Sequence, residues 1–451
     1  MKSLIVALPL IAGATWAGTS YFAGAQSEAG YDQFLSQTNA ANFLTFEKES
    51  FEQGLTTSKA VTVVKESSAP DAEVLFRLAH DINHSSVQLN DNSPSVGTAT
   101  IRTTLVDGSI NSRYDNIHSF FTGDEPIEII TRAGVAGHVA SEITLGALTL
   151  TSGEKETATV EETKITLTND ADRIVGDGAI GAVVINSTDG SSATISASIV
   201  SFDLATEQMQ TSDSHLSVKT DEITAQTPYQ NTPITANGLQ LSFNSDVEGD
   251  QIDYLASINI DAIDTGSTPT IDTAPVTSGS LEIATNNFKI QAIRDYYGFL
   301  EGVDGNNFES FSSEYLHEFV KLATKNIELV MNLDLNNSAG NANATFNIAF
   351  IGDQSASGRD TIVTGKDLAN AIKVEADVVA DKAALALTPA VAMMQSPPAQ
   401  FAFEDQGDQW VSRLRATGLT AQINNEIIQL GDLTGGLLEL PLEEIREITG
   451  Y

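Results

Sequence analysis

Gly176, Gly178 and Gly181 have the spacing GxGxxG that dinucleotide-binding turns use. Such a site also needs a helix directly after the glycines and an acidic residue about 20 positions further on. The residues that follow are AVVINST (182–188), which favour an extended strand. The glycines therefore predict a glycine-rich turn or bulge rather than a nucleotide site.

Two further patterns resemble catalytic motifs but lack partners. His317-Glu318 would begin a zinc-binding HExxH pair, yet the position of the second histidine is Lys321. Ser152 and Lys155 have the spacing of the nucleophile in penicillin-recognising serine enzymes, but neither of the accompanying SDN and KTG motifs is present. We therefore expect His317-Glu318 to be a surface pair, and Ser152 and Lys155 to lie in a solvated turn.

Carboxylates gather in one polar segment, where Asp246, Glu248, Asp250 and Asp253 could supply oxygen ligands to calcium. Gly249 stands fourth from Asp246, whereas an EF-hand loop needs glycine at its sixth position. A polar hairpin turn is the first reading, and weak calcium binding is the alternative. The remaining histidines are scattered: His80, His84, His118, His138 and His215. We therefore predict no catalytic residues, no cofactor, no metal site and no enzymatic activity.

The composition limits the class of protein. The chain has 451 residues, of which 23 are Lys or Arg and 60 are Asp or Glu, so the formal net charge is −37. An acidic surface repels phosphate backbones, which makes a nucleic-acid partner unexpected. The absence of Cys excludes disulfides and thiolate chemistry. Hydrophobic residues make up 41% of the chain, enough for a substantial core.

The N-terminal segment 1–27 predicts export. Lys2 precedes an uncharged stretch, and the first acid is Glu28, an arrangement that places the N-terminus in the cytoplasm and the rest outside. Residues 4–25 are long enough to cross a bilayer as a retained single helix. The alternative is a secretory signal cleaved after Ala25, which would release the body into the soluble periplasm.

The rest of the chain predicts a mainly β, α+β protein built on one large, curved antiparallel meander. Apolar and polar residues alternate with a period of two, as in Leu329, Met331 and Leu333, which indicates strands with one covered and one wet face. Residues 28–53 read as a juxtamembrane helix or stalk, and 54–303 as the antiparallel sheet. The segment 304–451 reads as an amphipathic helix followed by strands that complete the same sheet.

The clearest helix covers 306–326. Its apolar residues recur at steps of three and four and form one stripe, which we expect to lie on the sheet: Phe308, Phe311, Tyr315, Phe319 and Leu322.

This helix also carries a family resemblance. DGNNFESFSSEYLHEFVKL (304–322) is similar to the YdgA-like family of bacterial envelope proteins. Further segments resemble the family in the same order: Trp16 to Gly24, DINHSS (81–86), IRTTLVDGSI (101–110), ITRAGVAGHVASEITL (130–145) and TGLTAQINNEIIQLGDL (417–433). The last of these resembles a closing hairpin that turns at Asn424-Asn425.

The resemblance implies an inner-membrane-anchored periplasmic protein without assigned catalytic residues. We expect a non-enzymatic cell-envelope protein tethered by 4–25, whose partners are the inner membrane and possible envelope proteins. The alternative is a carrier or binder of lipid or another apolar ligand along a groove of the sheet.

Overall fold

Two compact units make up the computed structural model. The first contains Met1–Glu207 and Leu216–Tyr229, and the second contains Gln208–His215 and Gln230–Tyr451. The residues that the structure describes are 35, 45–54, 57–65, 74–83, 87–90, 93–106, 121–122, 126–134, 139–152, 156–170, 173–205, 211–229, 232–264, 276–301, 327–351, 370–385 and 402–429.

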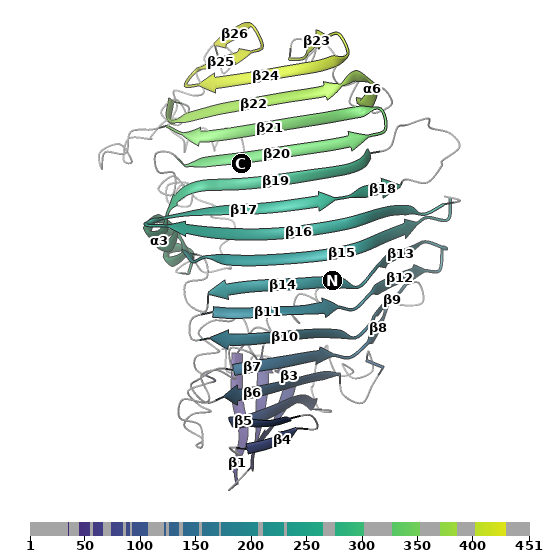
Figure 1. Cartoon of the computed structure of the whole chain (residues 1–451), viewed down its shortest axis with the longest axis vertical. Helices are drawn as coiled ribbons and strands as arrows, with labels where there is room; N and C mark the ends of the chain where they lie inside the picture. The colour runs from purple at the N-terminus through teal and green to yellow at the C-terminus, as the bar shows by residue number, and fades with distance from the viewer. Residues whose placement is uncertain are drawn as a thin grey trace. The chain divides into compact units, whose positions relative to one another are not determined.

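The strands of the first unit form antiparallel ladders (Figure 1). One ladder runs in the order β1–β2–β3–β5–β6–β7–β10–β11–β14, with β4 paired to β5. A second ladder runs β8–β9–β12–β13–β15. The bounds are β1 (Thr45–Gln53), β2 (Thr57–Lys65), β3 (Val74–Asn83), β4 (Val87–Asn90), β5 (Ser93–Val106), β6 (Ile127–Gly134), β7 (Val139–Leu145), β8 (Leu148–Ser152), β9 (Glu156–Val160), β10 (Thr163–Asp170), β11 (Arg173–Ile180), β12 (Val183–Ser187), β13 (Ser192–Ile195), β14 (Ser198–Ala205) and β15 (Ser214–Gln226).

A line of breaks separates these two ladders. β7 and β8, β10 and β9, β11 and β12, and β14 and β13 are each one extended run interrupted for two residues. Two of these interruptions lie side by side: the Glu161 amide at one break donates a hydrogen bond to the Ala182 carbonyl at the next (2.9 Å). At the same place the Gly181 amide donates to Thr163 Oγ1 (2.9 Å). Figure 1 shows β8, β9, β12 and β13 bending away, beyond this line, from the strands that they continue, β7, β10, β11 and β14.

The core of the first unit is one face of its ladder. Directly paired residues share a face of an antiparallel sheet, so the register brings together a cluster of five buried apolar side chains: Ile129, Ile143, Ile165, Leu167 and Val200. On the opposite face, the alternate residues Lys164, Thr166 and Thr168 are exposed. One covered face and one wet face are therefore confirmed here.

The second unit is one antiparallel ladder in the order β16–β17–β19–β20–β21–β22–β24–β25–β26, with β18 on β16 and β23 on β24 (Figure 1). The bounds are β16 (Ile234–Glu248), β17 (Gln251–Ile260), β18 (Ala262–Asp264), β19 (Val276–Lys289), α3 (Ile290–Glu301), β20 (Glu328–Asn337), β21 (Gly340–Phe350), β22 (Ile372–Asp381), α6 (Lys382–Leu385), β23 (Glu404–Gln406), β24 (Gln409–Thr417), β25 (Thr420–Ile423) and β26 (Glu426–Gln429). The turn at Asn424-Asn425 is confirmed, because Ile423 pairs with Glu426 across it.

Two predictions about local structure are wrong. Thr45–Gln53, expected within a helix or stalk at 28–53, is strand β1, because Phe46 pairs with Val64 of β2 and is buried there. Gly176 and Gly178, expected in a glycine-rich turn or bulge, lie in strand β11, which pairs with β10 and β14 without a break in register.

Other predictions fall outside the described residues. These include the N-terminal helix at 4–25, the amphipathic helix at 306–326 and residues 28–34. None of the helices in the described part of the chain is long and apolar enough to cross a membrane. What the structure does bear out is the coarser statement that this is a mainly antiparallel β protein.

Candidate functional site

The glycines of the GxGxxG pattern lie in the sheet. Gly176 and Gly178 belong to β11, and Gly181 lies at the break before β12. A Cβ on Gly178 would stand 2.4 Å from the Lys164 carbonyl oxygen, and one on Gly176 would stand 2.4 Å from Cζ of Phe202. The spacing therefore serves close packing within the ladder, and a strand follows it where a nucleotide site needs a helix.

The four carboxylates of the calcium alternative lie on the β16–β17 hairpin, as the hairpin reading predicted. Lys289 Nζ is 2.7 Å from Asp250 Oδ2, and this hydrogen bond lowers the pKa of the Asp250 carboxyl. The Asn287 amide donates to Asp253 Oδ1 (2.6 Å). Both carboxylates thus hold the local structure together. Among the described residues, no three or more His, Asp or Glu side chains are arranged to hold a metal ion.

Of the scattered histidines, the structure describes His80 and His215, and the ring of His80 is the one that packs inside the sheet; His84, His118 and His138 lie outside the described residues. His80 lies on β3, with Nε2 2.8 Å from Thr62 Oγ1 and Nδ1 2.8 Å from Thr103 Oγ1. Burial lowers the pKa of this ring from 6.5 to about 4, although the charge of Asp81 acts in the opposite direction. A neutral ring held between two hydroxyls fits a structural role, since both nitrogens are occupied.

The structure does not bring together the other candidate catalytic or metal-binding residues that it describes. Ser152 ends β8 and pairs with Glu156, the first residue of β9, so the serine stands at a hairpin as expected. His215 lies at the start of β15 with Nδ1 2.6 Å from Asn244 Oδ1. Lys155 and His317-Glu318 are outside the described residues.

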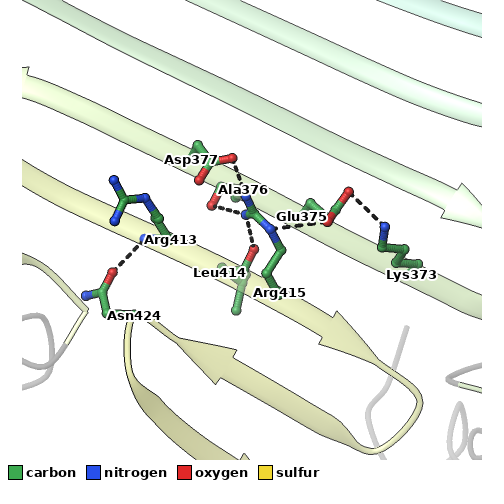
Figure 2. A network of polar contacts seen from close by, with 8 residues as sticks. All are labelled: Lys373, Glu375, Ala376, Asp377, Arg413, Leu414, Arg415 and Asn424. Carbon is green, nitrogen blue, oxygen red and sulfur yellow. Dashed lines mark hydrogen bonds and ion pairs between the residues drawn. The ribbon is translucent and has the colours of Figure 1, made fainter.

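The second unit has two chemically different faces. On what we call the polar face, β22 carries Lys373, Glu375 and Asp377 beside Arg415 of β24 (Figure 2). Arg415 lies 2.6 Å from Asp377 and 3.2 Å from Glu375, and Lys373 lies 3.0 Å from Glu375. These pairs neutralise one another along the strand, an arrangement typical of a stable solvated face.

The opposite surface, which we call the apolar face, is built from two cross-strand rows. The first apolar row crosses six strands, and the second crosses seven, with each residue directly paired to the next. The first row is Leu241, Ile258, Leu281, Leu333, Ala344 and Val378. The second is Phe243, Ala256, Ile283, Met331, Phe346, Ala376 and Leu414.

Residues beside these rows keep the face uncharged. On one side stand Tyr254, Thr285, Leu329, Ile348 and Val374, and on the other Ile260, Gly279, Leu335, Ala342 and Ala380. The carboxylates of the same strands, such as Glu282 and Asp334, alternate onto the polar face.

The apolar face is open to solvent over several strands. Six large side chains on it are between 37% and 41% exposed, although they belong to adjacent strands: Leu241, Phe243, Ile258, Ile283, Leu329 and Met331. By contrast, Ile252 at the end of β17 is 0% exposed, because Ile293 of α3 packs on it. Exposed apolar side chains on adjacent strands make this face the candidate interaction surface of the second unit.

Sequence reasoning identified which residues of one strand share a face but not this surface. Alternation at Leu329, Met331 and Leu333 predicted an apolar side for β20, and the structure confirms it. The register that aligns Ile258, Leu281 and Leu333 is set by pairing between β17, β19 and β20, strands joined by long connections, and the pattern of one strand does not specify it.

Comparison with known protein families identifies the chain. Residues 1–430 match the family described as bacterial protein of unknown function (DUF945), so the chain belongs to that family. No curated protein and no solved structure matches it.

Proposed function

We propose that this member of a bacterial family of unknown function is a non-enzymatic, membrane-tethered envelope protein that binds lipid or another apolar ligand on the apolar face. The observation that carries the binding role is the pair of apolar rows across β16 to β24, with side chains near 40% exposed. Ligand sites are mostly apolar surfaces with few polar groups, and this face has that chemistry. A buried ligand would remove these side chains from water.

The tether and the location form the second part of the proposal. Residues 4–25 hold the chain in the inner membrane, and the body lies in the periplasm, beside a source of lipid. The chain has a formal net charge of −37, so anionic headgroups repel its acidic body and the sheet itself stays off the bilayer surface. The YdgA-like resemblance at 304–322 supports the same location.

Cell fractionation tests the tether. An epitope-tagged chain should sediment with membranes, be released by detergent and be digested by protease added to spheroplasts. A matched variant without residues 4–25 should stay in the cytosol. Tagged chain in the soluble periplasmic fraction, at the mass expected from cleavage after Ala25, would refute the retained tether. Full-length chain in the cytosol would refute export.

Lipid analysis tests the binding role. Protein purified gently, without delipidating detergent, should carry a reproducible lipid that organic extraction and mass spectrometry identify. Preparations that repeatedly contain no apolar molecule would argue instead for an envelope scaffold without a ligand.

A further inference from the structure

We infer that the occupant of the apolar face is a single extended hydrocarbon chain that lies across the strands, between the first and second apolar rows. This inference rests on the proposed function and specifies its ligand class and orientation. The geometry of an antiparallel sheet supplies the first argument, and the hydrogen-bonding and charge of the face supply two more.

The direction follows from two spacings. Neighbours within a row, such as Ile283 and Met331, stand on adjacent strands about 4.8 Å apart, so their side chains touch and form a ridge. The two rows are two residues apart along each strand, as Ile283 and Leu281 are, which separates the ridges by about 6.7 Å. A methylene chain keeps about 4 Å from each neighbouring carbon. It therefore sits deeper in the wider furrow between two ridges than in the narrower furrow between two strands.

The hydrogen-bonding capacity of the face excludes an extended peptide as occupant. The side chains of both rows are hydrocarbon or thioether groups, and the strand backbones beneath them are paired in the ladder. A peptide laid on the rows would bury amide and carbonyl groups without partners, which is costly. A hydrocarbon chain has no such groups.

Charge points to the same class of ligand. The rows contain no ionisable residue, and acids such as Glu282 and Asp334 project from the polar face. The cations of β22 and β24, Lys373 and Arg415, are on the polar face and already paired with acids. The complementary occupant is therefore uncharged along its buried length. The six strands that both rows cross, about 4.8 Å apart, accommodate roughly 24 Å of it.

Single-cysteine variants provide the test, because the chain contains no Cys. Ile258→Cys replaces a residue of the first row. Ile283→Cys and Met331→Cys replace residues of the second row, and the three positions lie on three different strands. Their alkylation by iodoacetamide would be timed with and without an uncharged monoacylglycerol as the probe. At a probe concentration about ten times its Kd, all three rates should fall about tenfold. The matched controls Ser257→Cys, Glu282→Cys and Asn332→Cys, on the polar face, should react at unchanged rates.

A chain-length series gives an independent readout. Affinity should rise about three- to fourfold for each methylene added to the monoacylglycerol, until the chain exceeds the rows. Each variant should keep the circular dichroism spectrum of the parent protein.

The outcomes separate the inference from the proposed function. Protection of Leu329→Cys and Met331→Cys on β20 without protection of Ile258→Cys would overturn the orientation and leave apolar binding intact. Protection at no apolar position, in protein that still co-purifies with lipid, would place the ligand elsewhere and overturn the inference. Absence of both protection and lipid would overturn the proposed function itself.

Discussion

Nδ1 of His80 lies 2.8 Å from Oγ1 of Thr103, inside the covered face of the first unit. The ring connects β3 to β5, and its other nitrogen contacts Thr62 of β2, so one side chain joins three strands. We therefore expect the stability of the first unit to depend on the protonation of this ring.

Acid should destabilise the protein through His80. Burial lowers the pKa of the folded-state ring from 6.5 to about 4, so between these values the unfolded chain binds a proton that the folded chain does not. The contribution is fully present above pH 6.5 and declines as the pH falls to 4, by about 3 kcal/mol in the free energy of unfolding. Urea unfolding at a series of pH values measures it.

His80→Gln should lose this component of the pH dependence, whereas His215→Gln, at the surface beside Asn244, should retain it. Equal pH slopes for the parent protein and His80→Gln over that window would contradict the assignment.

The close packing at the line of breaks predicts an intolerant glycine. A Cβ on Gly181 would stand 2.2 Å from the Glu161 carbonyl oxygen, so Gly181→Ala must shift backbone and should cost about 1–3 kcal/mol in the free energy of unfolding. Thermal unfolding compares it with Gly249→Asn, at a φ of 66° with open space around it, which asparagine tolerates. Similar melting temperatures for both variants would show that the break at Gly181 is not tightly packed.

The two ends of β17 predict contrasting costs for the same substitution. Ile252 is 0% exposed under Ile293 of α3, so Ile252→Ala should lower the free energy of unfolding by about 2–5 kcal/mol. Ile258 on the apolar face is 40% exposed, so Ile258→Ala should cost less than about 1.5 kcal/mol. Urea unfolding of ligand-free protein measures both. A larger loss for Ile258→Ala would mean that the apolar face is part of a closed core.

An unsatisfied amide predicts a stabilising substitution. Among the described residues, Asn347 Oδ1 is a buried side-chain oxygen without a hydrogen-bond partner. Asn347 pairs with Val330 on β20, so Asn347→Val should raise the free energy of unfolding by roughly 1 kcal/mol. Thermal unfolding checks it against Asn343→Val, an exposed position on the same strand. A destabilised Asn347→Val would indicate that the amide is satisfied in solution.

The sequence predicted the type of fold because strand alternation is a local signal. The segment with Leu329, Met331 and Leu333 was assigned correctly as a strand, since one-sided burial leaves a period of two along it. Strand β11 was missed because Gly176 and Gly178 lack the side chains that carry this signal. Strand β1 was missed because the spacing of its phenylalanines does not alternate, and pairing with β2 overrides it.

The candidate site was less predictable than the fold. Its uncharged surface arises from pairing between strands, as between Ile283 and Met331, whose positions are 48 residues apart by their numbers. The sequence of one strand indicates which side chains share a side, but the register that joins them into rows is set by pairing with strands that are distant in the chain.

The most direct test compares lipid bound by the parent protein and by a variant of the apolar face. The double variant Ile283→Gln/Met331→Gln places two amides in the second apolar row, and Glu282→Gln/Asn332→Gln places them on the polar face of the same strands. Each protein would be purified identically, and its extracted lipid would be quantified by mass spectrometry per mole of chain. We predict that the polar-face variant retains the parent amount and the apolar-face variant loses most of it. Equal lipid in all three proteins, or none in the parent protein, would contradict a ligand site on this face.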